Sequence, residues 1–195
     1  VRHEIVPMDQ SFVKDCLDNI DRTVTRMGRI IHGIEFLGAQ KKDTIVATSI
    51  AAVINEAREL SAPKVEGSNI NLKIDIDQNY KLTCRATLLS QVFANLIRNS
   101  CDAISTQPEK WINIKVRRVG KMLECEITDS GKPVEQKEKY QWFEPYYTTK
   151  EKTKSGSGLG LYLSKKIIEN HGGKIELDFE SVVTRFVILL PISQS

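Results

Sequence analysis

The sequence predicts a two-layer α/β sandwich, in which helices cover one face of a mixed sheet, preceded by a long helix of a helical bundle. Short segments that alternate in polarity are separated by segments whose apolar residues recur every three to four positions. Alternating strands imply a sheet with one buried face, so helices are expected on that face only. A chain of 195 residues with 41% hydrophobic and 27% charged side chains supports one main core plus a smaller part.

Charge and composition exclude several classes of function. The net charge is only +3 and the basic residues are scattered among acidic ones, so nucleic-acid binding is not expected. The longest apolar run, 186–190, is far shorter than the roughly 20 residues of a membrane span, and the first residues show no signal-peptide pattern. The chain is expected to be cytoplasmic without membrane contact, either alone or as the cytoplasmic portion of a membrane-anchored protein.

The cysteines indicate a reducing environment. None forms a C-x-x-C pair, and all lie among apolar residues, so they are predicted to be reduced, buried thiols rather than disulfides or zinc ligands. They are Cys16, Cys84, Cys101 and Cys125.

The N-terminal segment is predicted to be one amphipathic helix. Apolar residues recur at three-to-four spacing over 12–37, after Pro7, which gives a helix about 40 Å long. A core helix would show the same pattern, but a helix of this length ahead of a compact remainder favours packing in a bundle. Gly38 and the polar residues after it place a boundary near residue 42.

The remaining elements follow from periodicity and turn residues. In order, they are a helix over 48–60, strands over 70–76 and 80–84, a helix over 86–104, a hairpin of strands 112–116 and 123–127, an irregular stretch over 129–157, a helix ending at 170, and strands over 175–179 and 186–190. An irregular stretch of this length inside a compact domain is usually a functional lid.

The helix over 86–104 carries a stripe of polar residues. Gln91, Asn95, Asn99 and Asp102 are spaced so that they share one side about 80° wide. A solvated face would give the same division, but exposed stripes favour Lys and Glu, because amide side chains lower helix propensity. Asn offers a neutral oxygen for Mg²⁺ and an NH₂ donor for phosphate. From this helix alone, both interpretations remain open.

Two glycine-containing segments lie within or beside the predicted lid. Asp129-Ser130-Gly131 ends a strand, so its carboxylate could accept a hydrogen bond from an exocyclic amine, although such a sequence is also a common turn. The segment 156–161, GSGLGL, opens directly into a helix and could bind phosphate with its free N–H groups. It matches neither the dinucleotide fingerprint nor the P-loop, and a flexible hinge would also explain it.

Taken together, four motifs resemble those of sensor histidine kinases of two-component systems. QVFANLIRNSCDAI, DSG, FEPYYTTK and GSGLGL resemble the N box, first glycine box, F box and second glycine box, and FEPYYTTK is most similar to the nitrogen-regulation subgroup. The resemblance covers about 45–195 and implies the Bergerat ATP-binding fold of the GHKL superfamily. It implies that 1–42 are part of the dimerisation hairpin, mostly its second helix, and that 43–195 are the catalytic domain, with a lid over about 130–157.

The resemblance also implies cofactors, ATP and Mg²⁺, and a role for each site residue. Asn99 would be the Mg²⁺ ligand and Asn95 its catalytic companion one turn earlier. Asp129 would accept from the adenine amino group, and Gly131 would let adenine approach. The further nucleotide-binding residues would be Asp102, Thr148, Thr149, Lys150, Gly156, Gly158, Gly160, Leu161 and Thr184, the last through water.

The sequence departs from the family pattern at three positions and leaves two alternatives. Pro133 and Val183 stand where Gly is usual, and Arg85 where an acidic residue is common; Pro133 is expected to stiffen the start of the lid. A GHKL ATPase would have a Glu at the position of Asn95, and a carboxamide cannot take a proton from water. A regulatory module that binds nucleotide without kinase activity is the second alternative.

No histidine in the chain is expected to be the phosphoacceptor. His3 is followed too soon by Pro7, His32 is predicted to be a packing or surface residue, and His171 belongs to the end of a helix. The chain is therefore predicted not to autophosphorylate by itself. The resemblance implies a response regulator as the partner of the full-length protein, which would be a homodimer through the hairpin.

Overall fold

The computed structural model describes residues 44–134, 141–148 and 158–192, together with seven residues nearer the N-terminus. These seven, all helical as predicted, are Val13, Lys14, Cys16, Leu17, Asn19, Ile20 and Thr23. The rest of the predicted long helix and the boundary near residue 42 lie outside the described residues. Cys16 is exposed, so the prediction of a buried thiol is wrong there, because no described residue packs over that side of the helix. The other three cysteines are buried as predicted.

A five-stranded mixed sheet forms one layer of the fold. Its strand order is β2-β4-β5-β7-β6, with β2 parallel to β4 and the other neighbours antiparallel. The bounds are β2 Asn71–Ile76, β4 Trp111–Val119, β5 Met122–Asp129, β6 Lys174–Leu177 and β7 Arg185–Pro191. The predicted β4–β5 hairpin is confirmed, and Gly120 at its turn takes the left-handed φ of 63° that glycine adopts without strain.

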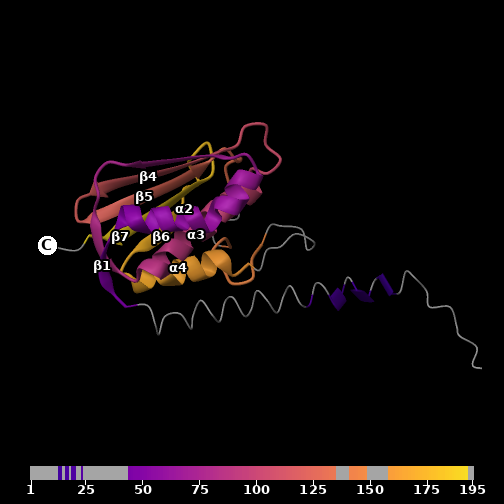
Figure 1. Cartoon of the computed structure of the whole chain (residues 1–195), viewed down its shortest axis with the longest axis horizontal. Helices are drawn as coiled ribbons and strands as arrows, with labels where there is room; N and C mark the ends of the chain where they lie inside the picture. Colours follow the sequence, from indigo (N-terminus) through magenta and orange to yellow (C-terminus); the bar gives the residue numbers. More distant parts are fainter. Residues whose placement is uncertain are drawn as a thin grey trace, which may run out of the picture.

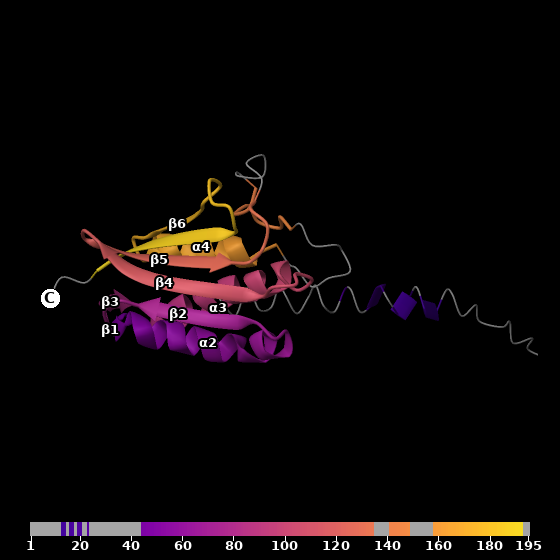
Figure 2. The same cartoon turned by 90° about the horizontal axis from the view of Figure 1, so that it is seen from above.

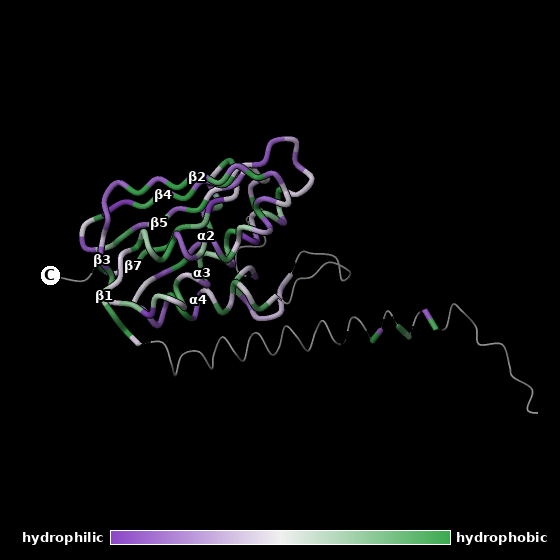
Figure 3. Tube along the Cα trace, in the orientation of Figure 1, coloured by the Kyte–Doolittle hydropathy of each residue, from purple (hydrophilic) through white to green (hydrophobic). Residues whose placement is uncertain are grey.

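Three helices form the other layer. They are α2 Ile50–Gly67, α3 Ala86–Ala103 and α4 Gly160–Asn170, and Figures 1 and 2 show them side by side on one face of the sheet. Along the strands, buried apolar residues alternate with half-buried or exposed ones. Figure 3 shows the corresponding alternation of hydrophobic and hydrophilic residues. The predicted two-layer architecture is confirmed, and its core lies between the sheet and α3, which contributes ten buried residues.

Two elements differ from the prediction. Val46–Ser49 form a short strand, β1, which pairs with β3 (Lys81–Cys84) in a separate two-stranded sheet. Helix α2 therefore begins later than predicted, at Ile50, where the Ser49 hydroxyl accepts a hydrogen bond from the Ala52 N–H. It also continues past residue 60 and through Pro63, because Ser61 and Val65 are buried in the core. Within the described residues, no helix has the length and apolarity needed to cross a bilayer.

Candidate nucleotide-binding site

The polar stripe of α3 is half-buried along its length. Gln91, Asn95, Asn99 and Asp102 are each partly accessible, whereas the opposite side of the helix is fully buried. Helix α3 packs against α4 on one flank and α2 on the other. The stripe is therefore not a simple solvated face, and its members lie close to two different helices.

Asn95 connects α3 to the first turn of α4. Its Nδ2 donates to the Ser164 Oγ over 3.0 Å, and the Ser164 hydroxyl donates to the Gly160 carbonyl over 2.9 Å. Because the single proton of Ser164 goes to Gly160, Ser164 must accept from Asn95, and this decides which amide atom is the oxygen. The Asn95 Oδ1 lies beside Gly160, where a Cβ would approach it to 2.5 Å. Glycine at 160 thus permits this close contact.

Asn99 and Asp102 lie farther along the same stripe and differ in their contacts. The side chain of Asn99 makes no hydrogen bond to any residue that the structure describes, so its amide is available to a ligand. The Asp102 carboxylate instead pairs with the Lys64 Nζ of α2 at 2.5 Å. Asp102 is directed towards α2 rather than α4.

The carboxylate of Asp129 ends β5 in a buried position. Its Oδ2 accepts from the Ser100 Oγ over 2.6 Å, and its Oδ1 accepts from the Gly131 N–H over 2.9 Å. Burial raises the pKa of Asp129 above its usual 3.8, although hydrogen bonds from Ser100 and Gly131 act in the opposite direction. A Cβ at Gly131 would lie 2.6 Å from the Oδ1, so only glycine fits this close to the carboxylate.

Thr184 reaches the same place from the start of β7. Its carbonyl accepts from the Asp129 N–H over 3.2 Å, and its hydroxyl donates to the Lys132 carbonyl over 2.9 Å. Lys132 and Pro133 are exposed, whereas Val134 packs on the core, so the start of the lid is attached on both sides of Pro133.

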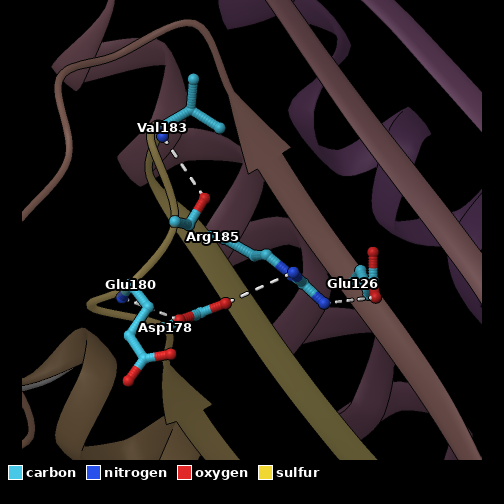
Figure 4. A network of polar contacts seen from close by, with 6 residues as sticks. Glu126, Asp178, Glu180, Val183 and Arg185 are labelled. Atoms are coloured by element: carbon cyan, nitrogen blue, oxygen red, sulfur yellow. Dashed lines mark hydrogen bonds and ion pairs between the residues drawn. The ribbon is translucent and has the colours of Figure 1, made fainter.

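The loop before Thr184 is ordered by Arg185, as Figure 4 shows. The Arg185 guanidinium bonds to the Glu126 Oε1 of β5 at 2.7 Å and to the Asp178 Oδ2 at 3.3 Å. Within the loop, the Glu180 N–H donates to the Asp178 side chain, and the Val183 N–H donates to the Ser181 side chain. These contacts place Thr184 beside Asp129, and Val183 occupies the usual glycine position without a positive φ.

Trp142 and Phe143, within the predicted lid, pack against the core. The Trp142 ring packs edge-on against Phe186, with centroids 6.4 Å apart, and the Lys165 Nζ lies 5.8 Å from the centre of the Phe143 ring. The Tyr146 N–H donates to the Gly158 carbonyl over 3.0 Å, and both residues have left-handed backbones. The F-box and second glycine-box segments are therefore directly bonded.

The other predicted site residues are placed as follows. Leu161 packs against the core, and Thr148 is exposed. Thr149, Lys150 and Gly156 lie outside the described residues. Sequence reasoning missed Ser100 and Ser164; their one available signal was position, directly after Asn99 and one turn after Gly160.

Comparison with known proteins assigns the sequence to one family. Residues 84–194 match the family described as "Histidine kinase-, DNA gyrase B-, and HSP90-like ATPase". The chain is 29% identical over 178 residues to the nitrogen regulation protein NtrY of Azorhizobium caulinodans, covering 89% of this chain and 22% of NtrY. It is 30% identical over 165 residues to sporulation kinase E of Bacillus subtilis, covering 83% of this chain and 22% of that kinase.

Solved structures agree in fold. The catalytic domain of histidine kinase ThkA superposes with a TM-score of 0.65 at 28% identity, covering 76% of this chain and 95% of that domain. A structure of ThkA in complex with the response regulator TrrA gives a TM-score of 0.68 at 22% identity, with 98% of this chain and 54% of that one covered. The predicted family is confirmed: the chain belongs to the histidine kinase-, DNA gyrase B- and HSP90-like ATPases.

Proposed function

We propose that this chain is the catalytic fragment of a sensor histidine kinase, which binds Mg-ATP and transfers the γ-phosphoryl group to a histidine for relay to a response-regulator aspartate. One observation carries the proposal: a single helix, α3, contacts both ends of the site. Ser100 contacts the Asp129 carboxylate, and Asn95 contacts the first turn of α4. The two residues are about 7.5 Å apart along the helix axis, a separation that a ribose can bridge between base and phosphates.

The base would bind at Asp129. The ionised carboxylate is an acceptor for the exocyclic amine of adenine, and Gly131 leaves room for the ring against the backbone. Thr184 lies at the same edge and supports a contact through water. Lys132 and Pro133, which begin the lid, would cover this side of the base.

The phosphates would bind at the start of α4. Gly158 and Gly160 allow close approach to N–H groups that have no partner within the helix, and the positive end of the helix dipole favours anions. The N-cap residue Leu159 provides no side-chain cap, which leaves these donors for a ligand.

The available amide of Asn99 fits a Mg²⁺ ion. Magnesium commonly takes one or two protein oxygens together with substrate phosphates, so the lack of any cluster of three His, Cys, Asp or Glu side chains among the described residues is compatible with it. Asn99 would supply its Oδ1, with Asn95 as companion. The metal, when bound, would neutralise charge on the transferred phosphoryl group.

Phosphoryl transfer to a protein side chain is favoured over ATP hydrolysis. A hydrolase needs a base one turn before Asn99, but Asn95 at this position is an amide that donates to Ser164. A carboxylate there would be paired only if the Ser164 proton turned away from the Gly160 carbonyl.

The acceptor histidine is proposed to lie in another part of the protein. Both ring nitrogens of His171 are engaged: Nδ1 lies 2.7 Å from the Ile167 carbonyl, and Nε2 accepts from the Arg85 N–H over 3.1 Å. His3 and His32 are outside the described residues. We propose that 1–42 are mostly the second helix of a dimerisation hairpin, that the full-length protein is a homodimer, and that a response regulator is its partner, as TrrA is for ThkA.

Two experiments test the proposal. Titration with an ATP analogue, with and without Mg²⁺, should show binding by the wild type that Mg²⁺ strengthens, and Asn99→Ala should lose this strengthening. Incubation with labelled ATP should leave no acid-labile phosphate on this chain alone. The full-length protein, which would carry the acceptor histidine, should become labelled. No measurable nucleotide binding would overturn the proposal, whereas binding without transfer in the full-length protein would indicate a regulatory module.

A further inference from the structure

The buried carboxylate of Asp129 is approached by a separate donor at each oxygen. Ser100 donates to Oδ2 from α3, and the Gly131 N–H donates to Oδ1 from the chain that leaves β5. Asp129 and Ser100 are each only 1% exposed, so bulk water does not replace the Ser100 hydroxyl or the Gly131 N–H as a donor to the carboxylate. The orientation of the carboxylate is therefore set by Ser100 together with Gly131.

These contacts favour the ionised carboxylate. A carboxylate accepts at both oxygens, whereas a proton on Oδ2 would compete with the Ser100 hydroxyl for the same position. Burial raises the pKa of Asp129, and the hydrogen bonds from Ser100 and Gly131 oppose this change. Among the described residues, the titratable group interacting with Asp129 is the Cys101 thiol, whose own pKa is raised by burial and which stays neutral.

We propose that Ser100 is a positioning residue that sets base selectivity, by keeping both Asp129 oxygens as acceptors so that the site takes a 6-aminopurine and rejects a 6-oxopurine. This inference rests on the proposed nucleotide-binding function. Adenine presents an N–H donor to the Asp129 carboxylate. Hypoxanthine and guanine present a carbonyl oxygen instead, which would face the lone pairs of the carboxylate and form no hydrogen bond. A site built to accept from a substrate amine discriminates strongly, because a mismatched base leaves a buried polar group unpaired.

Replacement of Ser100 should favour the protonated form of Asp129 over the ionised form. In Ser100→Ala, the ionised carboxylate loses one donor, so its protonation becomes easier in the same buried position. A protonated Asp129 can donate to a 6-oxo group. The variant should therefore bind adenine less tightly and should discriminate less against hypoxanthine, most of all at acidic pH.

The test uses ADP and IDP, titrated calorimetrically in EDTA between pH 5.5 and 8.5. For Ser100→Ala, we expect ADP affinity at pH 7 to fall about tenfold or more, as for other hydrogen bonds to charged groups. We also expect the ADP-to-IDP ratio to fall, and the pH below which ADP binding weakens to move upwards. Ser100→Cys, which retains a weaker donor of similar size, should give intermediate values.

The matched control is Ser61→Ala. Ser61 is equally buried, but its hydroxyl donates only to backbone carbonyls of Ala57 and Ala94, so this change should leave the ratio and the pH profile as in wild type. The inference alone is overturned if wild type binds ADP and Ser100→Ala keeps its ADP-to-IDP ratio and pH profile. If wild type binds no adenine nucleotide, the proposed function is overturned, and the inference with it.

Discussion

Asn95 and Ser164 form a hydrogen bond of 3.0 Å that joins the helix of the asparagine stripe to the helix that follows the lid. The two residues are 69 positions apart in the sequence. Since Ser164 also donates to Gly160, one serine links the Asn95 amide to the first turn of α4. The placement of Asn95 and the placement of the proposed phosphate-binding N–H groups are thus mutually dependent.

This bond predicts a coupled effect on stability. Ser164→Ala should lower the free energy of unfolding by about 1 kcal/mol, because the half-buried Asn95 NH₂ loses its acceptor. Asn95→Asp should cost at least as much, since it removes the NH₂ donor, and its carboxylate is paired only if the Ser164 proton turns away from the Gly160 carbonyl. In a double-mutant cycle measured by chemical denaturation, the cost of Asn95→Asp should be smaller in the Ser164→Ala background; strict additivity would contradict the proposed geometry.

Gly160→Ala should separate ligand binding from stability. Its Cβ would lie 2.5 Å from the Asn95 Oδ1, so the amide must shift, although alanine favours the helix by up to about 1 kcal/mol. We expect little net loss of stability but at least about tenfold weaker Mg²⁺-dependent binding of an ATP analogue, measured by titration. Gly67→Ala, in α2 with nothing within 4 Å of its Cβ, is the control and should bind normally.

Gly158→Ala should detach the lid from the start of α4. Gly158 has a φ of 67°, and an added Cβ would overlap the backbone of Tyr146, to which its carbonyl is bonded. We expect faster amide exchange at Tyr146 and weaker nucleotide binding, while core amides remain protected. Gly120 has a similar φ of 63°, but nothing lies within 4 Å of an added Cβ, so Gly120→Ala measures the cost of the backbone conformation alone. Equal effects of Gly158→Ala and Gly120→Ala would argue against the overlap with Tyr146.

Asp129→Asn should change the pH dependence of stability and weaken adenine binding. Because burial raises the pKa of Asp129, the folded state binds this proton more tightly than the unfolded state, and the associated stability is lost as pH rises through the raised pKa. The stability of the variant relative to wild type should therefore rise with pH through this range, while the new NH₂, which must face the Ser100 hydroxyl or the Gly131 N–H, costs stability at every pH.

Adenine binding by Asp129→Asn should fall by about ten- to a hundredfold, since the charged acceptor is lost. Thermal unfolding of both proteins across pH 4 to 8, with ADP titrations at pH 7, measures the two effects. The prediction is contradicted if the stability of Asp129→Asn relative to wild type increases as pH falls.

Much of the architecture follows from local pattern. The alternation in β4 and β5, the glycine at their turn, and the polar stripe of α3 depend on neighbours within a few positions, and all were predictable. Strand β1 was not, because none of its four residues is fully buried and the strand exists through its pairing with β3. Helix α2 extends through Pro63 because tertiary burial of Val65 outweighs a local helix-breaking signal.

For the site, the sequence by itself determined which motifs are present and in what order: the asparagine stripe, Asp129 with Gly131, and the glycines before α4. Only the tertiary structure decided how they are connected, because Ser100 contacts Asp129 across 29 positions and Ser164 contacts Asn95 across 69. A serine hydroxyl has no preferred partner in the sequence; it donates to the acceptor that packing brings within about 3 Å. Periodicity specifies faces of helices and strands, whereas these buried hydrogen bonds depend on which faces meet.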